Sequence, residues 1–173
     1  MKKIVLSLMF AAILVACDDA HKCKFVEEDG TLRCPEKNYK TVSILGKNWV
    51  AENSNFFTDF SYCYGNDYKM CESFGRLYTW EASKKACPVG WRVPTKAEFL
   101  ELLQYGEFEK LNVLAAGFRY YEDNYVDREK AARFWTSDEY DGTRAYMMSV
   151  EGDEILAEHF NKSIAASVRC IQE

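Results

Sequence analysis

The chain holds seven cysteines in 173 residues, and their positions constrain its fold more than any other feature. Cys17 ends an N-terminal leader, discussed below, which leaves six: Cys23, Cys34, Cys63, Cys71, Cys87 and Cys170. An even set of cysteines in an exported chain is typical of a disulfide framework, although their number alone allows many pairings. No Cys-x-x-Cys pair is present and the only histidines are His21 and His159, so a zinc site is disfavoured.

Spacing along the chain narrows the pairing. Cys23 and Cys34 enclose Asp29-Gly30, a strong signal for a tight hairpin turn whose two ends come together. Cys63 and Cys71 enclose a short loop of turn-forming residues that a bridge could pin, and Cys87 and Cys170 remain for each other. We therefore predict three disulfides: Cys23–Cys34, Cys63–Cys71 and Cys87–Cys170.

The leader predicts export. Met1-Lys2-Lys3 makes its start positive, and the apolar stretch Ile4 to Val15 has twelve residues. That stretch is too short to cross about 30 Å of hydrocarbon as a helix, and it is typical of a signal peptide over residues 1–16. The leader ends in Leu14-Val15-Ala16-Cys17, which resembles the lipobox of bacterial lipoproteins. The resemblance implies cleavage before Cys17 and lipidation of Cys17, with acyl chains holding the protein on a membrane. The alternative is an ordinary secretory signal with Cys17 in a disulfide.

Charge excludes one class of partner. The chain has 22 Lys and Arg against 27 Asp and Glu, and removal of the leader leaves 20 against 27, a balance of −7. A negative domain without a basic run argues against nucleic acid, because phosphate neutralisation supplies most of that affinity. No second apolar run is long enough to cross a membrane, so lipid at Cys17 is the predicted membrane contact. The predicted location is the bacterial cell envelope, at the outer membrane or the cell surface.

Composition divides the mature chain in two. Residues 17–37 are polar and charged apart from the small cystine hairpin, and we interpret them as the lipid anchor and tether. Asp18 and Asp19 are a candidate sorting signal. Residues 38–173 are then a single domain, long enough to bury a core.

Local patterns within residues 38–173 predict two helices and several short strands. Thr79 can cap a helix with Trp80 to Cys87, and Thr95 with Glu98 forms a capping box for a second helix. Residues 53–69 are loop-like, and turn signals such as Glu151-Gly152-Asp153 separate strands in the second half. Two helices followed by a strand-rich half predict an α+β domain.

Several motifs resemble one family, the Fibrobacter succinogenes major paralogous domain, a module found mainly in secreted and surface proteins. The motifs follow one another over nearly all of residues 39–171. They are Tyr39-Lys40-Thr41-Val42, Trp49-Val50-Ala51-Glu52-Asn53, Tyr62-Cys63-Tyr64, Phe74-Gly75-Arg76-Leu77-Tyr78-Thr79-Trp80, Cys87-Pro88-Val89-Gly90-Trp91-Arg92-Val93-Pro94-Thr95, Ala116-Gly117-Phe118-Arg119, Phe134-Trp135-Thr136-Ser137 and Ser167-Val168-Arg169-Cys170.

The same stretch is similar, more distantly, to C-type-lectin-like domains. In those domains a Trp-containing helix ends in a cysteine that is bridged to the last strand, and a second helix follows. Trp80, Cys87, Trp135 and Cys170 fall in that order. The resemblance implies a disulfide-stapled α+β fold with two helices packed on short antiparallel strands, and again the Cys87–Cys170 pair.

No metal, cofactor or catalytic residue is predicted. Calcium-dependent lectins use an acid-Pro-Asn loop and a later Trp-Asn-Asp, and both are missing, since the prolines are Pro35, Pro88 and Pro94. Two histidines, one of them in the tether, give no Ser-His-Asp set. A carboxylate pair for glycoside hydrolysis is a spatial feature that sequence does not reveal.

Aromatic residues, 15% of the chain, offer the best candidate site. Tyr120, Tyr121 and Tyr125 gather in a polar segment, and aromatic faces beside amides and carboxylates suit carbohydrate or protein surfaces. A second segment is equally aromatic, with Phe56, Phe57, Phe60, Tyr62 and Tyr64. The alternative is that these rings form the core of long loops.

The prediction is a surface-anchored lipoprotein acting as an extracellular binding module for a glycan or a protein, without calcium. Such binding should survive a chelator and respond weakly to salt. Two alternatives stay open: an enzyme that acts on cell-wall polysaccharide, and a structural envelope protein without a small ligand.

Overall fold

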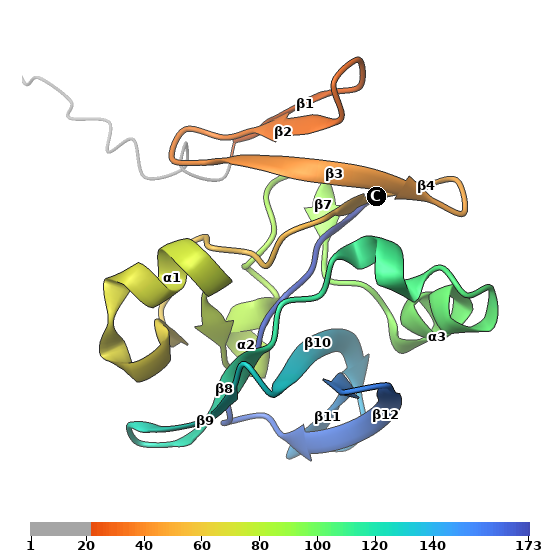
Figure 1. Ribbon diagram of the computed structural model, residues 1–173. Coiled ribbons are helices and arrows are strands. Elements are labelled where there is room, and N and C mark those ends of the chain that lie inside the picture. The colour runs from red at the N-terminus through yellow and green to blue at the C-terminus, as the bar shows by residue number, and fades with distance from the viewer. Residues whose placement is uncertain (1–21) are drawn as a thin grey trace, which may run out of the picture.

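Strands dominate the fold of the protein, seen in a computed structural model that describes residues 22–173. About 42% of these residues lie in strands and about 18% in helices. Figure 1 shows two curled sheets, one above the other, with short helices at their sides. The predicted α+β arrangement of two helices packed on short strands is therefore wrong, and the structure does not show a C-type-lectin-like core.

The first sheet has six strands, and its middle comes from distant parts of the chain. β13 lies between β4 and β7, with Ile171 opposite both Trp49 and Arg92. Each neighbouring pair of strands is antiparallel. The order across the sheet is β1 (Lys24–Val26), β2 (Thr31–Arg33), β3 (Asn38–Ile44), β4 (Lys47–Val50), β13 (Ile171–Gln172) and β7 (Trp91–Arg92).

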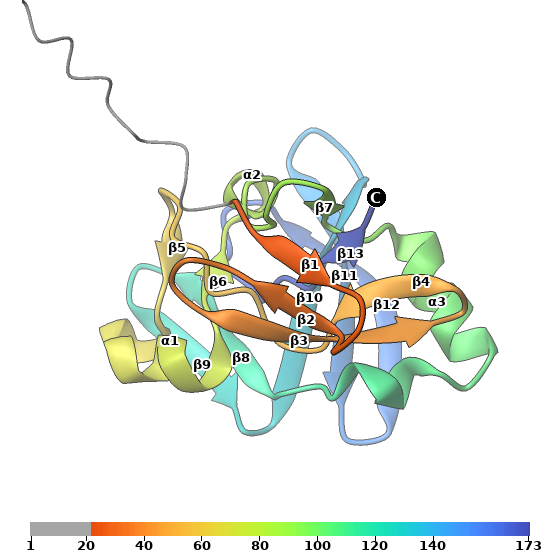
Figure 2. The same cartoon turned by 90° about the horizontal axis from the view of Figure 1, so that it is seen from above.

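The N-terminal cystine hairpin belongs to this sheet. β2 pairs with β3, and Figure 2 shows β1, β2 and β3 running side by side across the face turned to the viewer, which is the upper side of the molecule in Figure 1. Leu32 is fully buried, and the ring of Phe25 meets that of Trp91 edge-on with centroids 5.7 Å apart. The hairpin, which the sequence assigns to the tether, is thus packed on the body of the domain.

The second sheet has five strands: β12 (Glu154–Asn161), β11 (Arg144–Glu151), β10 (Ala131–Glu139), β8 (Ala116–Tyr121) and β9 (Asn124–Arg128). β10 and β8 are parallel, with Ala132 opposite Gly117. Gly117 has φ +65°, and a Cβ there would lie 2.2 Å from the Val126 carbonyl oxygen, so only glycine permits β8 and β9 to approach this closely. A separate antiparallel pair joins β5 (Ser61–Tyr62) to β6 (Leu77–Tyr78).

The helices are short. They are η1 (Tyr64–Asn66), α1 (Tyr68–Phe74), α2 (Trp80–Ser83), α3 (Lys96–Gln104) and η2 (Phe108–Leu111), where η denotes a 3₁₀ helix. Thr79 caps α2 as predicted, although α2 ends at Ser83 rather than near Cys87. α1 falls partly in the segment predicted as loop, and begins where the Asp67 side chain accepts a hydrogen bond from the Lys69 N–H.

The predicted capping box of α3 is confirmed. The Thr95 hydroxyl accepts from the Glu98 N–H, and the Glu98 carboxylate accepts from the Thr95 N–H. Burial raises the pKa of Glu98, but hydrogen bonds from Arg92 and from the Thr95 N–H outweigh it and lower the pKa to about 2. Glu98 is therefore ionised at neutral pH while it joins Arg92 to the start of α3.

Three disulfides staple the structure, and they are the three pairs predicted: Cys23–Cys34, Cys63–Cys71 and Cys87–Cys170. The second pins η1 to α1, and the third ties the segment after α2 to the residue that precedes β13.

Cys17 and the leader lie outside the described residues. No helix within residues 22–173 is long and apolar enough to cross a membrane.

Candidate functional site

The structure separates the three tyrosines proposed from the sequence. Tyr120 and Tyr121 end β8, where an irregularity interrupts its pairing with β9. Their side chains are 41% and 56% exposed, and their ring centroids lie 4.3 Å apart, edge to face. A hydrogen bond with Tyr120 raises the pKa of the Tyr121 hydroxyl. The pair forms a small exposed aromatic surface at the tip of the hairpin.

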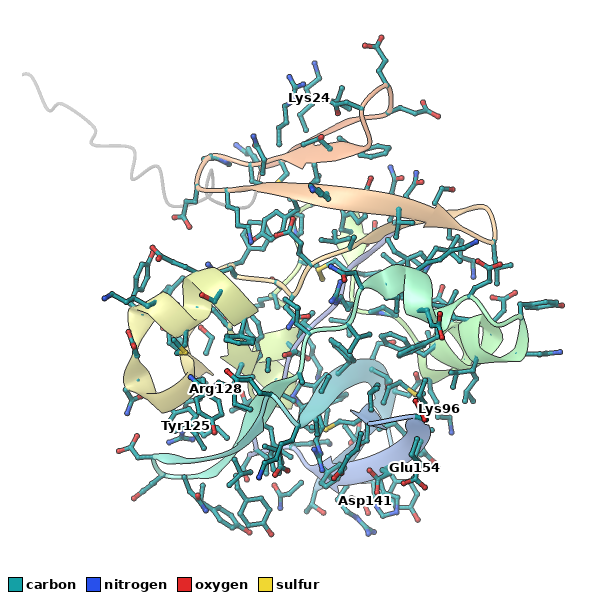
Figure 3. All side chains as sticks on the ribbon, viewed as in Figure 1. Lys24, Lys96, Tyr125, Arg128, Asp141 and Glu154 are labelled. Carbon is teal, nitrogen blue, oxygen red and sulfur yellow. A yellow bond between two sulfur atoms is a disulfide. The ribbon has the colours of Figure 1, made fainter. Side chains whose placement is uncertain are left out.

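Tyr125 faces the other way, toward η1. Its hydroxyl donates to the Asn66 side-chain oxygen at 2.7 Å, and its ring centroid lies 5.2 Å from that of Tyr64. Figure 3 places Tyr125 and Arg128 together below α1. Tyr125 therefore packs the β8–β9 hairpin onto η1, and the structure brings only Tyr120 and Tyr121 together.

A different group of rings lines a cleft of about 380 Å³. Three segments form this cleft: the start of β3 with the residues before it, the loop after β4, and α1 with Arg76, two residues beyond its end. The two named elements, β3 and α1, are seen at the top and left of Figure 1. We call it the aromatic cleft, and its lining residues are Glu36, Lys37, Tyr39, Asn55, Phe56, Phe57, Tyr68, Glu72 and Arg76.

Two buried rings make one side of the aromatic cleft rigid. Tyr39 and Phe56 are only 3% and 5% exposed, and their rings stack with centroids 5.4 Å apart. The Asn55 N–H donates to the Tyr39 hydroxyl at 3.1 Å. Burial raises the pKa of Tyr39 to about 12, so its phenol stays neutral.

Two exposed rings stand at its edges. Phe57 and Tyr68 are each 66% exposed, on separate segments of the chain. Exposed aromatic rings lose their contact with water only when a ligand or another protein covers them. They provide a large contact area, and binding has to fix only two side-chain torsions for each ring. The aromatic cleft therefore has two exposed planar rings at its edges, beside the rigid side that Tyr39 and Phe56 form.

Polar groups complete the lining. The Asn55 side-chain oxygen is shielded from solvent and has no hydrogen-bond partner among residues 22–173. Lys37 is held by an ion pair with Glu52 at 2.7 Å, whereas Glu36 and Glu72 are exposed carboxylates. Such groups can exchange hydrogen bonds with hydroxyls of a ligand.

Local structure fixes these side chains in place. Gly75, with φ +77°, ends α1, and a Cβ there would lie 2.6 Å from the Asn53 Cβ. The Cys63–Cys71 bridge and the Asp67 cap hold α1, which carries Tyr68 and Glu72. The glycine at position 75 therefore lets α1 stop against the loop after β4, and both of these segments line the cleft.

A second cavity is larger, about 530 Å³, and lies between η2 and the β11–β12 turn. Its lining mixes aliphatic side chains such as Val113, Val150 and Ile155 with polar ones, and its one ring, Phe108, is 4% exposed. Among residues 22–173, no group of three or more His, Cys, Asp or Glu is placed to hold a metal ion. The aromatic cleft, with its exposed rings and the unpartnered Asn55 side-chain oxygen, is the better candidate site.

Only some of the residues that line the aromatic cleft could be recognised from the sequence. Phe56 and Phe57 belong to the second aromatic segment of the sequence, but no local pattern connects them with Tyr39, Tyr68 or Arg76. The place of Tyr68 at the start of a helix was not predicted, because residues 53–69 are loop-like in sequence. The signal that could have revealed α1 is Asp67 directly before Tyr68, since Asp is a favoured N-cap.

Comparison with known proteins bears on the same segment. No curated protein matches the chain. All the residues that line the aromatic cleft fall between positions 36 and 76, whereas Tyr120, Tyr121 and Tyr125 lie later in the chain. The family model of the Fibrobacter succinogenes major domain matches residues 35–112, and this match supports assigning the segment that contains the cleft to that domain family.

Proposed function

We propose that this protein is a surface-anchored bacterial lipoprotein whose domain binds an extracellular carbohydrate in the aromatic cleft, without calcium. The observation that carries the proposal is the pair of exposed rings, Phe57 and Tyr68, at the edges of a cleft with a rigid aromatic side. Amide and carboxylate groups stand beside these rings.

Carbohydrate suits this lining for physical reasons. A pyranose presents an apolar face of C–H groups and a rim of hydroxyls, so it can stack on a ring while its rim exchanges hydrogen bonds. Phe57 and Tyr68 supply the stacking surface, and the unpartnered Asn55 oxygen can accept from one hydroxyl. Glu36 and Glu72 can accept from others.

The cleft gives a first prediction. The double variant Phe57→Ala/Tyr68→Ala should bind a glycan identified by array about tenfold to a hundredfold more weakly, since each ring contributes on the order of 1 kcal/mol. Its melting temperature should stay nearly unchanged because both side chains are largely exposed. Glycan-array screening of the soluble domain followed by calorimetry measures both quantities.

The matched control is Tyr120→Ala/Tyr121→Ala, which removes two exposed rings elsewhere. It should bind like the unchanged protein. Loss of binding in this control alone would move the site to the β8–β9 hairpin, and binding abolished by a chelator would contradict the calcium-free mechanism. Release of reducing sugar from a bound polysaccharide would favour the alternative, an enzyme that uses Glu36 and Glu72.

Anchoring at the envelope rests on the lipobox-like end of the leader. Several acyl chains on Cys17 would each add about 0.8 kcal/mol per buried CH₂, enough for stable anchoring without a spanning helix. Only residues 18–22 separate Cys17 from Cys23, and the hairpin that starts there is packed on the domain. Six residue steps reach at most about 20 Å, so the anchored domain would stay close to the membrane surface.

A second prediction tests the anchor. Cys17→Ser should leave an unprocessed precursor and abolish metabolic labelling with a fatty acid, because the acylated side chain and the cleavage signal are lost together. Gel mobility and label incorporation measure the two effects. Normal cleavage and normal membrane retention of this variant would refute lipidation at Cys17.

A further inference from the structure

Arg76 is a buried cation without a carboxylate partner. It is 9% exposed, and no acidic side chain within residues 22–173 forms an ion pair with it. A desolvated charge is unfavourable unless other groups compensate it. Arg76 also lines the aromatic cleft, so a ligand can supply what the protein does not.

The hydrogen bonds of Arg76 leave part of the guanidinium unused. Its Nε donates to the Ser61 hydroxyl at 2.9 Å, and one terminal nitrogen donates to the Ser61 carbonyl at 3.2 Å. The other terminal nitrogen meets the Cys63 sulfur at 3.7 Å, and sulfur is a weak acceptor. Because a guanidinium has five N–H groups, one N–H on each terminal nitrogen is left without an acceptor among the described residues.

Arg169 shows how the same fold treats a buried arginine that has a purely structural role. It is fully buried, and its terminal nitrogens donate to the carbonyls of Val50, Leu111 and Asn112. Its Nε has no hydrogen-bond partner among the described residues, but Arg169 lines neither of the two cavities, so no ligand can reach it there. Arg76 differs because it lines the aromatic cleft, where a carboxylate can accept from its two remaining terminal N–H groups in a bidentate geometry.

The stacking surface lies next to this donor pair. The Arg76 guanidinium carbon is 5.1 Å from the centroid of the Phe57 ring. In a uronic acid the carboxylate is attached directly to the pyranose ring, so one sugar unit presents an apolar face and an anion a few ångströms apart. Phe57 and Arg76 are close enough for one such unit to contact both.

We propose that the ligand of the aromatic cleft is an acidic glycan, and that a uronic acid unit stacks on Phe57 while its carboxylate binds Arg76. This inference rests on the proposed function and specifies its ligand class. Glu36 and Glu72 are exposed at the same cleft and repel a second anion. The cleft is therefore selective for one carboxylate at Arg76, with neighbouring units held through hydroxyls.

The decisive test changes the ligand and leaves the protein intact. Oligogalacturonate and glucuronate-containing oligosaccharides are compared, by calorimetry on the soluble domain, with the same molecules after reduction of each carboxyl to a primary alcohol. Reduction should weaken binding on the order of tenfold to a hundredfold, as expected for loss of a hydrogen bond to a charged group. The effect should persist at high salt, because a buried ion pair is weakly screened.

The outcomes separate this inference from the function on which it rests. Equal affinity for the acidic and reduced forms would overturn the acidic-glycan proposal and leave carbohydrate binding standing. Absence of binding to any glycan on an array would overturn both. Equal affinity for an acidic peptide such as oligoglutamate would show a general anion site and also overturn the proposal.

Protein variants give an independent readout. Arg76→Gln should erase the preference, so that the acidic and reduced forms bind with similar affinity, whereas a folding defect would lower both affinities and keep their ratio. Arg76→Lys keeps the positive charge but loses the planar pair of donors, so it should retain more of the preference for the acidic form than Arg76→Gln does. Glu72→Gln should raise affinity for the acidic form relative to the reduced form, because it removes a nearby like charge. Unchanged preference in Arg76→Gln, with its fold verified by melting, would refute the assignment.

Discussion

Replacing Cys87 and Cys170 together with alanine is expected to lower the free energy of unfolding by about 4.5 kcal/mol. The bridge closes a loop across a sequence separation of 83 residues, and the entropy that a crosslink removes from the unfolded chain grows with loop length. It also ties the segment after α2 to the start of β13, the strand that joins β4 to β7. Denaturant titration of the oxidised proteins measures the difference.

The other two bridges provide the controls. Their separations are 11 and 8 residues, so removing either pair should cost about 2.5 to 3 kcal/mol by the same relation. The expected order therefore has Cys87–Cys170 clearly first. Equal losses for all three pairs would mean that loop entropy does not govern their contributions, and peptide mapping that joined Cys87 to Cys63 or Cys71 would contradict the framework itself.

Arg169→Ala is expected to destabilise the protein by about 4 kcal/mol. The guanidinium is fully buried, donates to three backbone carbonyls and lies 5.4 Å from the Phe134 ring centroid. Burial lowers its pKa to about 9, which still leaves it charged at neutral pH. Alanine would leave the carbonyls unpaired and open a cavity, and each unsatisfied buried group costs on the order of 1 kcal/mol or more.

Two further variants separate these causes. Arg169→Met restores much of the volume but none of the donors, so it should recover only the packing part of the loss. Arg33→Ala removes an arginine whose ion pair with Asp29 is exposed, and it should change stability by less than about 1 kcal/mol. An Arg169→Met protein as stable as the unchanged one would show that the three carbonyl bonds contribute little.

Local signals in the sequence predicted local structure well. Asp29-Gly30 gave the β1–β2 turn, Thr95 with Glu98 gave the start of α3, and Glu151-Gly152-Asp153 gave the turn between β11 and β12. The pairing of the cysteines was also predictable from spacing. Each of these features depends on residues close together in the chain or on simple elimination, which is why sequence was enough.

The fold class depends on hydrogen-bonded pairing between strands that are far apart in the sequence, and no local pattern predicts such pairing. Two-residue strands such as β7 and β13 have no recognisable periodicity, yet they complete the first sheet through Ile171 between Trp49 and Arg92. The parallel contact of β8 with β10 is a single residue pair. The two predicted helices did form, but α2 has only four residues, so neither the count nor the order of elements indicated two curled sheets.

The candidate site shows the same division. The aromatic excess drew attention to two segments of rings, but three tyrosines close in sequence need not share a surface. The β8–β9 pairing has an irregularity between Arg119 and Tyr121, and Tyr125 packs against Tyr64 while Tyr120 and Tyr121 pack against each other. The aromatic cleft instead draws on segments around positions 37, 56, 68 and 76. Their meeting depends on how α1 and the loop after β4 pack, which only the folded chain specifies.

The order of the three bridges has a consequence for biogenesis. Each cysteine in the described part of the chain is joined to the next one along it: 23 to 34, 63 to 71, and 87 to 170. An oxidase that meets the thiols one after another, as a polypeptide emerges from a pore, therefore makes the native bonds at the first attempt. Oxidation in this order would make the three native pairs without thiol–disulfide exchange between wrong ones.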